Sequence, residues 1–117
     1  MAHCHCSMCR KFHGSAFATY GEAKKDQFRW LAGEDLLVNY VAGNKTTRQF
    51  CKLCGSSLTF KAASGQEDCV EFALGTLDSA IDLRPDAHIY VGSKANWVNL
   101  CDGLPQHIEG RNSPTKA

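Results

Sequence analysis

Three cysteines within six residues constrain the start of this chain more than any other feature. Cys4, Cys6 and Cys9 follow one another at C-x-C and C-x-x-C spacing. An extended C-x-C segment turns both thiols to the same side, and the C-x-x-C turns the backbone so that a third thiol can reach the same point. Thiolates this close together favour a borderline cation such as zinc. The segment therefore predicts a locally built metal site.

The first cluster supplies three ligands, whereas a structural zinc is closed by four. Three protein ligands and an open position are typical of a reactive zinc. We expect that arrangement here, so Cys4, Cys6 and Cys9 are the candidate catalytic residues, acting as zinc ligands. Two alternatives stay open: reduced cysteines without metal, or a site closed by a nearby histidine. The histidines considered are His3, His5 and His13.

The ligand type indicates the chemistry of such a site. Thiolates donate charge, so a zinc with three of them is a weaker Lewis acid than a zinc with three histidines. It suits the capture of another thiolate, because zinc lowers the pKa of a thiol that it binds. We therefore expect a small thiol substrate, presented to an electrophile. Arg10 and Lys11 follow the cluster and would offset its negative charge.

A second cysteine pair, Cys51 and Cys54, has C-x-x-C spacing and is followed by Gly55. Two thiols on a tight turn that ends in glycine are typical of a zinc knuckle. We expect both cysteines to be metal ligands that need two more partners. The alternative is a redox pair, but the βαβ context of such pairs is missing.

Composition restricts the class of protein. The chain has 117 residues, 44% hydrophobic and 21% charged, which fits one globular domain. A net charge of +1 gives no electrostatic case for nucleic acid or for an anionic membrane. No apolar run approaches membrane-spanning length, and the start does not resemble a signal peptide. We expect a cytoplasmic protein, in which cysteines at C-x-x-C spacing are metal ligands or redox pairs more often than structural disulfides.

Short apolar segments separated by turn residues predict an all-β domain over residues 1–109, with zinc-bearing loops. The predicted strands are 17–20, 28–31, 36–41, 46–50, 57–60, 70–74 and 89–91. The pair 36–41 and 46–50 is expected to form a hairpin through Gly43-Asn44, and a turn is expected at 63–65. Ser7 is expected to cap a helical turn that ends near Gly14, with further turns at 78–83 and 94–98.

The small, polar segment 110–117 is expected to be a flexible tail. Outside the cysteines, His88 and His13 are candidates for lining the site, although a lone histidine is more often structural. Arg48 suits a carboxylate, but a surface position on a strand is the simpler interpretation. Asp102 is expected to set a turn.

Several different motifs are spread along nearly the whole chain. They are Cys4-His5-Cys6-x-x-Cys9-Arg10-Lys11, Arg48-x-Phe50-Cys51-x-x-Cys54-Gly55-Ser56, Gly75-Thr76-Leu77-Asp78, Pro85-x-x-His88-Ile89 and Asp102-Gly103-Leu104-Pro105. In this combination the chain resembles the glutathione-dependent formaldehyde-activating enzyme family, also called the centromere protein V domain family.

The resemblance implies a β-tent fold of small antiparallel sheets. It also implies a zinc at the substrate site, held by Cys4, Cys6 and Cys9, and a structural zinc that uses Cys51 and Cys54. The implied activity is that of a zinc-dependent carbon-sulfur lyase, which joins glutathione and formaldehyde into S-(hydroxymethyl)glutathione. The alternatives are a lyase for another thiol adduct and a non-enzymatic zinc-binding structural or interaction module.

The chain departs from the family at its start. Family members carry another C-x-C pair on an earlier strand, which completes the structural zinc, whereas this chain begins Met1-Ala2-His3. We expect either that the start has been placed too late or that the segment has been lost. Cys69 and Cys101 are the remaining candidate ligands for the second site. A missing edge strand would also favour a homodimer.

A merged site is the sharper alternative. Cys4 and Cys6 would join Cys51 and Cys54 in one closed tetrahedron, since four thiolates are a common structural set. Cys9 would then be free, and no open position would remain.

Overall fold

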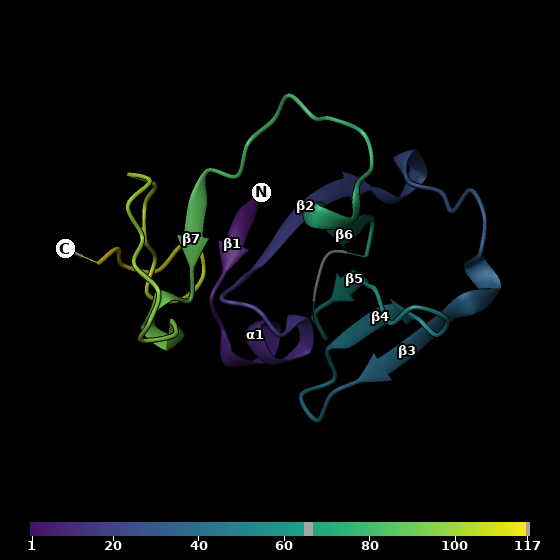
Figure 1. The fold of residues 1–117 in the computed structure, drawn as a ribbon, viewed down its shortest axis with the longest axis horizontal. Coiled ribbons are helices and arrows are strands. Elements are labelled where there is room, and N and C mark those ends of the chain that lie inside the picture. The colour runs from purple at the N-terminus through teal and green to yellow at the C-terminus, as the bar shows by residue number, and fades with distance from the viewer. Residues whose placement is uncertain (65–66, 117) are drawn as a thin grey trace. The chain divides into compact units, whose positions relative to one another are not determined.

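A computed structural model describes residues 1–64 and 67–116. These residues form seven strands, one α-helix and four short 3-10 helices, so the mostly-β expectation is confirmed. Hydrogen-bonded neighbours follow the order β3-β4-β5-β6-β2-β1-β7 (Figure 1). The sheet is mixed, because β7 pairs with β1 in parallel. Small antiparallel sheets were expected instead. No helix in the described part of the chain is long and apolar enough to cross a membrane.

The chain divides into two compact units, which are described separately. The first unit contains Met1–Tyr20 and Ser79–Ala117, and the second contains Gly21–Asp78. Strand β2 (Ala18–Lys24) begins in the first unit and ends in the second. The expectation of a single domain over residues 1–109 stays a prediction.

Strand β1 (Ala2–Cys4) lies at the centre of the first unit (Figure 1). It runs antiparallel to the start of β2, with Cys4 opposite Ala18, and parallel to β7 (Ala87–Ile89), with Cys4 opposite Ile89. We did not predict β1, because three residues are too few to show an alternating pattern. Strand β7 also begins two residues before the predicted strand at 89–91.

Helix α1 (Ser7–His13) follows β1 directly. Its N-cap is Cys6 and not Ser7, since the Cys6 sulfur accepts a hydrogen bond from the backbone N–H of Cys9 at 3.3 Å. The helix ends at Gly14, as predicted, with φ at 61°. Glycine adopts this left-handed conformation without the steric cost that other residues incur. The predicted helical turn at 78–83 is not found.

The last residues of the chain fold back on themselves. The backbone N–H of Ile108 donates to the carbonyl of Pro114, and that of Lys116 donates to the carbonyl of Gln106. The Arg111 guanidinium donates to Asp86 at 2.6 Å. The described part of the tail thus has defined partners, and its flexibility in solution stays a prediction.

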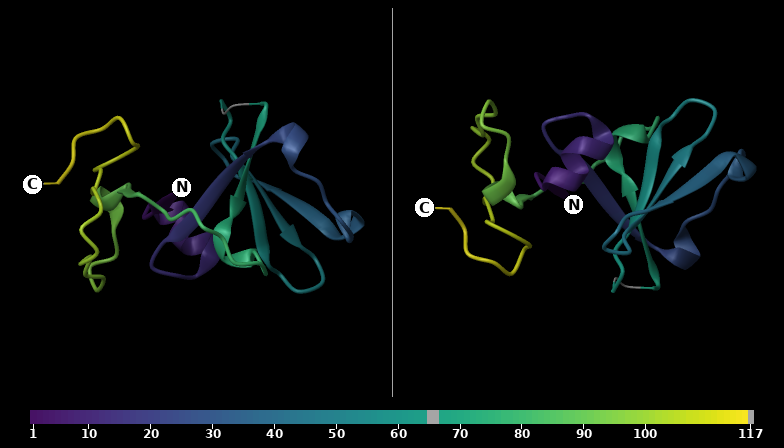
Figure 2. Two further views of the ribbon diagram at one scale, coloured as in Figure 1. Left: turned by 90° about the horizontal axis from the view of Figure 1, so that it is seen from above. Right: turned by 90° about the horizontal axis from the view of Figure 1, so that it is seen from below.

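The second unit is built on adjacent strands, visible in both views of Figure 2. They are β3 (Leu37–Val41), β4 (Thr47–Cys51), β5 (Ser57–Lys61) and β6 (Cys69–Ala73). The predicted hairpin of β3 and β4 is confirmed, but the residue with positive φ in its turn is Lys45. The predicted turn at 63–65 reaches beyond the described residues at Gly65.

Two predictions in the second unit were wrong. Residues 28–31 form no strand, because the ring of Phe28 packs against Trp30 and Phe72 from an irregular segment. Arg48 does not lie on the surface: it is 2% exposed, and its guanidinium lies 4.9 Å from the centre of the Phe60 ring. Both predictions, the strand at 28–31 and the surface position of Arg48, rested on the local sequence pattern. Tertiary packing places these side chains differently.

Candidate metal centre

The thiols of Cys4, Cys6 and Cys9 converge in the first unit. Their sulfur atoms all lie within 4.8 Å of one another. Cys4 closes β1, Cys6 caps α1 and Cys9 lies in the first turn of that helix, so the strand-to-helix corner brings them together. Cys4 is 7% exposed and Cys9 3%, while Cys6 is half-buried. The convergence predicted from spacing is therefore observed.

Hydrogen bonds distribute protons unevenly over the three thiols. The Cys6 sulfur accepts hydrogen bonds from the thiols of Cys4 and Cys9, and from the backbone N–H groups of Cys9 and Met8. Together these lower the pKa of Cys6 to about 2. The hydrogen bonds with Cys6 and Cys9, and then burial, raise the pKa of Cys4 far above its usual value. The hydrogen bonds thus favour the thiolate at Cys6 and the thiol at Cys4, and a bound cation would displace the remaining protons. Three sulfurs in this arrangement fit a thiophilic ion such as zinc.

No histidine or carboxylate joins these cysteines among the described residues. His13 is occupied by the Tyr20 hydroxyl at 2.9 Å, and His3 belongs to a separate group. The side chains that pack against the cluster are Ala18, Tyr20 and Ile89. Within the first unit, the described residues thus place apolar neighbours against the three sulfurs and no fourth ligand beside them.

Two buried histidines and an aspartate lie in a row in the same unit. His5 Nε2 is 2.9 Å from His88 Nδ1, and His88 Nε2 is 2.8 Å from an Asp102 carboxylate oxygen. His5 is 0% and His88 1% exposed, whereas Asp102 is exposed. The ring of His3 packs beside that of His88, with centroids 4.8 Å apart.

The environment lowers the pKa values of His5, His3 and Asp102. Burial, with the nearby His88 and His3, lowers the pKa of His5 to about 4, so its imidazole is neutral at pH 7. Burial also lowers the pKa of His3, and His88 adds to the effect. The hydrogen bond from His88 lowers the pKa of Asp102, which therefore stays a carboxylate.

Sequence reasoning underestimated this row. We interpreted Asp102 as a turn residue, and it does accept a hydrogen bond from the Leu104 backbone at 3.1 Å. Its bond to His88 could not be inferred from spacing. One signal was present: His3-Cys4-His5-Cys6 alternates imidazoles and thiols, and an extended chain turns the two types to opposite sides.

Cys51 and Cys54 lie in the second unit: Cys51 is the last residue of β4, and Cys54 lies on the turn that follows. Gly55 closes this turn with φ at 79°, and its N–H donates to the Cys51 carbonyl at 2.7 Å. Hydrogen bonds from the backbone N–H groups of Cys54 and Leu53 lower the pKa of Cys51. Among the described residues of the second unit, no third metal-ligating side chain joins the pair. Their role as metal ligands stays a prediction.

The other sites considered stay predictions as well. Cys69 lies on β6, where burial and a hydrogen bond with Glu22 raise its pKa to about 11. The merged site draws two cysteines from each unit, so neither unit alone tests it.

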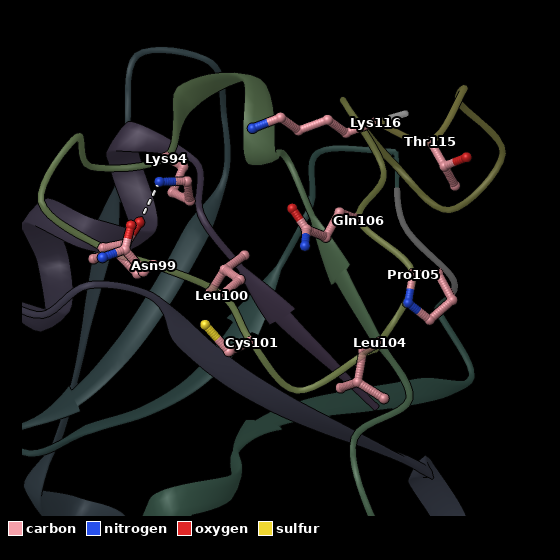
Figure 3. A pocket seen from close by; sticks show the side chains of 10 residues that line it. Lys94, Asn99, Leu100, Cys101, Leu104, Pro105, Gln106, Thr115 and Lys116 are labelled. Atoms are coloured by element: carbon pink, nitrogen blue, oxygen red, sulfur yellow. Dashed lines mark hydrogen bonds between the residues drawn. The ribbon is translucent and has the colours of Figure 1, made fainter.

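The first unit also contains an open pocket of about 820 Å³, which is separate from the three clustered cysteines (Figure 3). Its Lys94 ammonium donates to the carbonyls of Ala95 and Val98, and Cys101 lies in its wall. None of the three clustered cysteines lines it.

Comparison with known proteins places these features in a family. A family model described as glutathione-dependent formaldehyde-activating enzyme matches residues 1–93, a span that holds both cysteine clusters and His88. A search of the curated proteins found no match. Because the matched span is most of the chain, and its three amino-terminal thiols converge as a metal centre requires, the chain belongs to the glutathione-dependent formaldehyde-activating enzyme family.

Proposed function

We propose that the protein is a zinc-dependent enzyme of the carbon-sulfur lyase type, with glutathione as its thiol substrate. The sulfur of glutathione would bond to the carbonyl carbon of formaldehyde, while one electron pair of the C=O bond moves to the oxygen. That oxygen takes up the proton that the thiol loses, which gives S-(hydroxymethyl)glutathione. Membership of the family supports the glutathione and formaldehyde assignment.

One observation carries the proposal. Three sulfurs lie within 4.8 Å of one another, and no other metal-ligating side chain of the described residues joins them. A zinc ion held there would supply positive charge and an open position for an incoming thiolate. Cys4, Cys6 and Cys9 are thus proposed as its ligands.

The residues around the thiols support this chemistry. Three thiolates and a divalent cation carry one net negative charge, which Arg10 and Lys11 on α1 would offset. Arg10 is half-buried and its Nε atom is buried, so part of its guanidinium is withdrawn from water, where electrostatic effects are stronger. Tyr20 and Ile89 pack against the cluster and reduce the sulfur surface that water can reach. A thiolate held there loses less of its reactivity to hydration.

Two further assignments accompany the proposal. Cys51 and Cys54 would hold a second, structural zinc with ligands that lie outside the second unit's described residues, or in a second copy of the chain. The reaction belongs to a compartment rich in glutathione, which agrees with the expected cytoplasmic location.

The proposal is tested by replacing zinc with cobalt, whose absorption reports its ligands. Glutathione should shift the cobalt bands of the wild-type protein. Cys6→Ser and Cys9→Ser should weaken cobalt binding by at least tenfold, whereas Cys101→Ser, an exposed thiol of the same unit, should not. With ¹³C-formaldehyde and glutathione, NMR exchange spectra should show that the hydroxymethyl adduct forms faster with the protein than without it.

Two results would reject this function. One is native mass spectrometry showing a single zinc held by four cysteines, together with cobalt bands that glutathione does not move. The other is an unchanged metal content in Cys9→Ser, which the merged site predicts. Either result would favour a structural zinc module.

A further inference from the structure

We propose that Asp102, His88 and His5 form a positioning array that holds the segment carrying Cys4 and Cys6 in its metal-binding conformation. The proposal rests on the function proposed above, since it names residues that support the same site. None of the three residues belongs to the group of three cysteines. Their role is to orient and not to react.

The array connects the surface to the backbone between two ligands. Asp102 lies at the exposed end, where its second carboxylate oxygen accepts the Leu104 N–H at 3.1 Å. His88 connects the other two residues: its Nε2 lies 2.8 Å from Asp102, and its Nδ1 lies 2.9 Å from His5. His5 is fully buried and stands between Cys4 and Cys6 in the sequence.

The carboxylate fixes the direction of the first hydrogen bond, and the burial of His5 decides that of the second. Asp102 can only accept, so His88 donates from Nε2. In a neutral imidazole the other nitrogen, Nδ1, is then an acceptor, and His5 must donate to it from Nε2. This leaves a lone pair on His5 Nδ1, which is a buried atom with no hydrogen-bond partner. The opposite direction would leave a buried N–H without an acceptor, and such groups are rare.

The backbone reinforces the same connection. The His5 N–H donates to the Ile89 carbonyl at 2.9 Å, and Cys4 pairs with Ile89 across β1 and β7. His5 is therefore held through its main chain and its side chain. A rotation of its ring or a slip of β1 would move the flanking thiols, which leave the chain on the opposite side.

A metal site formed by His3, His88 and Asp102 is the competing interpretation, since one ligand atom from each lies within 4.8 Å of the others. The rings of His3 and His88 are tilted by 32°, with their centroids 4.8 Å apart. His3 Nδ1 is bonded to the Thr19 hydroxyl at 2.7 Å, and His88 Nε2 is engaged by Asp102. These contacts describe a hydrogen-bond network.

The test uses Asp102→Asn, because Asp102 is exposed and the replacement keeps its shape. Its matched control is Asp86→Asn, an exposed aspartate that pairs with Arg111 in the same unit. ¹⁵N spectra of wild-type imidazoles should show His5 with a proton on Nε2 and none on Nδ1. Asp102→Asn should change this tautomer and weaken cobalt binding at the cysteines by about 10- to 100-fold, the usual effect of residues that orient ligands. Asp86→Asn should do neither.

A second pair of variants guards against misfolding. His88→Asn places an amide oxygen where Nδ1 lies, so it can still accept from His5, and it should bind cobalt more tightly than His88→Leu. The proposal is overturned if Asp102→Asn and Asp86→Asn behave alike. It is also overturned if a Cys4→Ser, Cys6→Ser, Cys9→Ser triple variant still binds cobalt and loses it with Asp102→Asn. If the wild-type cysteines bind no metal, the proposed function fails, and the nitrogen spectra alone decide the array.

Discussion

At the residue scale, Cys6 performs two tasks with one sulfur atom. It caps α1 by accepting the Cys9 N–H, and it is the thiol on which the other two converge. A serine at an N-cap would satisfy the same N–H group but would offer no soft ligand. The residue that starts the helix is therefore also the one that ties the helix to the three-thiol cluster.

Glu71 gives a residue-scale prediction for the second unit. Burial, and then the nearby Glu22 carboxylate, raise the pKa of Glu71. The folded state thus binds this proton more tightly than the unfolded state, so stability is lost as pH rises through the folded pKa. We expect Glu71→Gln to raise the free energy of unfolding at pH 7 and to lose that advantage near pH 4. Urea unfolding at several pH values measures it.

The control for Glu71 is Glu34→Gln, which removes the charge of an exposed carboxylate in the same unit. A gain at pH 7 as large for Glu34→Gln as for Glu71→Gln would mean that burial of Glu71 is not the cause.

At the element scale, the contact of β2 with β6 depends on the absence of a side chain at Gly21. A Cβ atom there would lie 2.8 Å from Phe72 Cζ and 3.3 Å from Leu74 Cδ1. We expect Gly21→Ala to destabilise the protein by about 1–3 kcal/mol, the usual result of overpacking. Thermal or urea unfolding measures this difference.

Gly43→Ala is the matched control, because nothing lies within 4 Å of the added atom. Its effect should stay within about 0.5 kcal/mol. Phe72→Leu should partly restore Gly21→Ala in a double-mutant cycle. Independent, additive effects of the two changes would contradict the steric explanation.

At the scale of the whole molecule, the two units should respond differently to metal. Zinc that binds only the folded state stabilises the part that holds it. In a Cys51→Ser, Cys54→Ser double variant, we expect zinc to slow amide exchange in β1 and α1 and to leave β3 and β4 unchanged. Hydrogen exchange with mass spectrometry resolves both segments. A double variant that no longer binds zinc would instead support the merged site.

Much of the fold and of the site could be predicted where neighbours in the sequence are also neighbours in space. The hairpin of β3 and β4 and the end of α1 at Gly14 follow from turn residues alone. Segment 28–31 was wrongly predicted as a strand because its aromatic residues satisfy packing without sheet hydrogen bonds. Local composition cannot distinguish those two uses of an apolar residue.

By itself, the sequence determined the three-thiol cluster, because Cys4, Cys6 and Cys9 span one strand end and one helical turn, and backbone geometry brings them together. Only the tertiary structure decided what supports it. His5 and His88 are 83 residues apart, and they meet because β7 pairs in parallel with β1. Such a contact depends on how a long loop closes and on which strands pair. Those are properties of the whole fold and not of any local spacing.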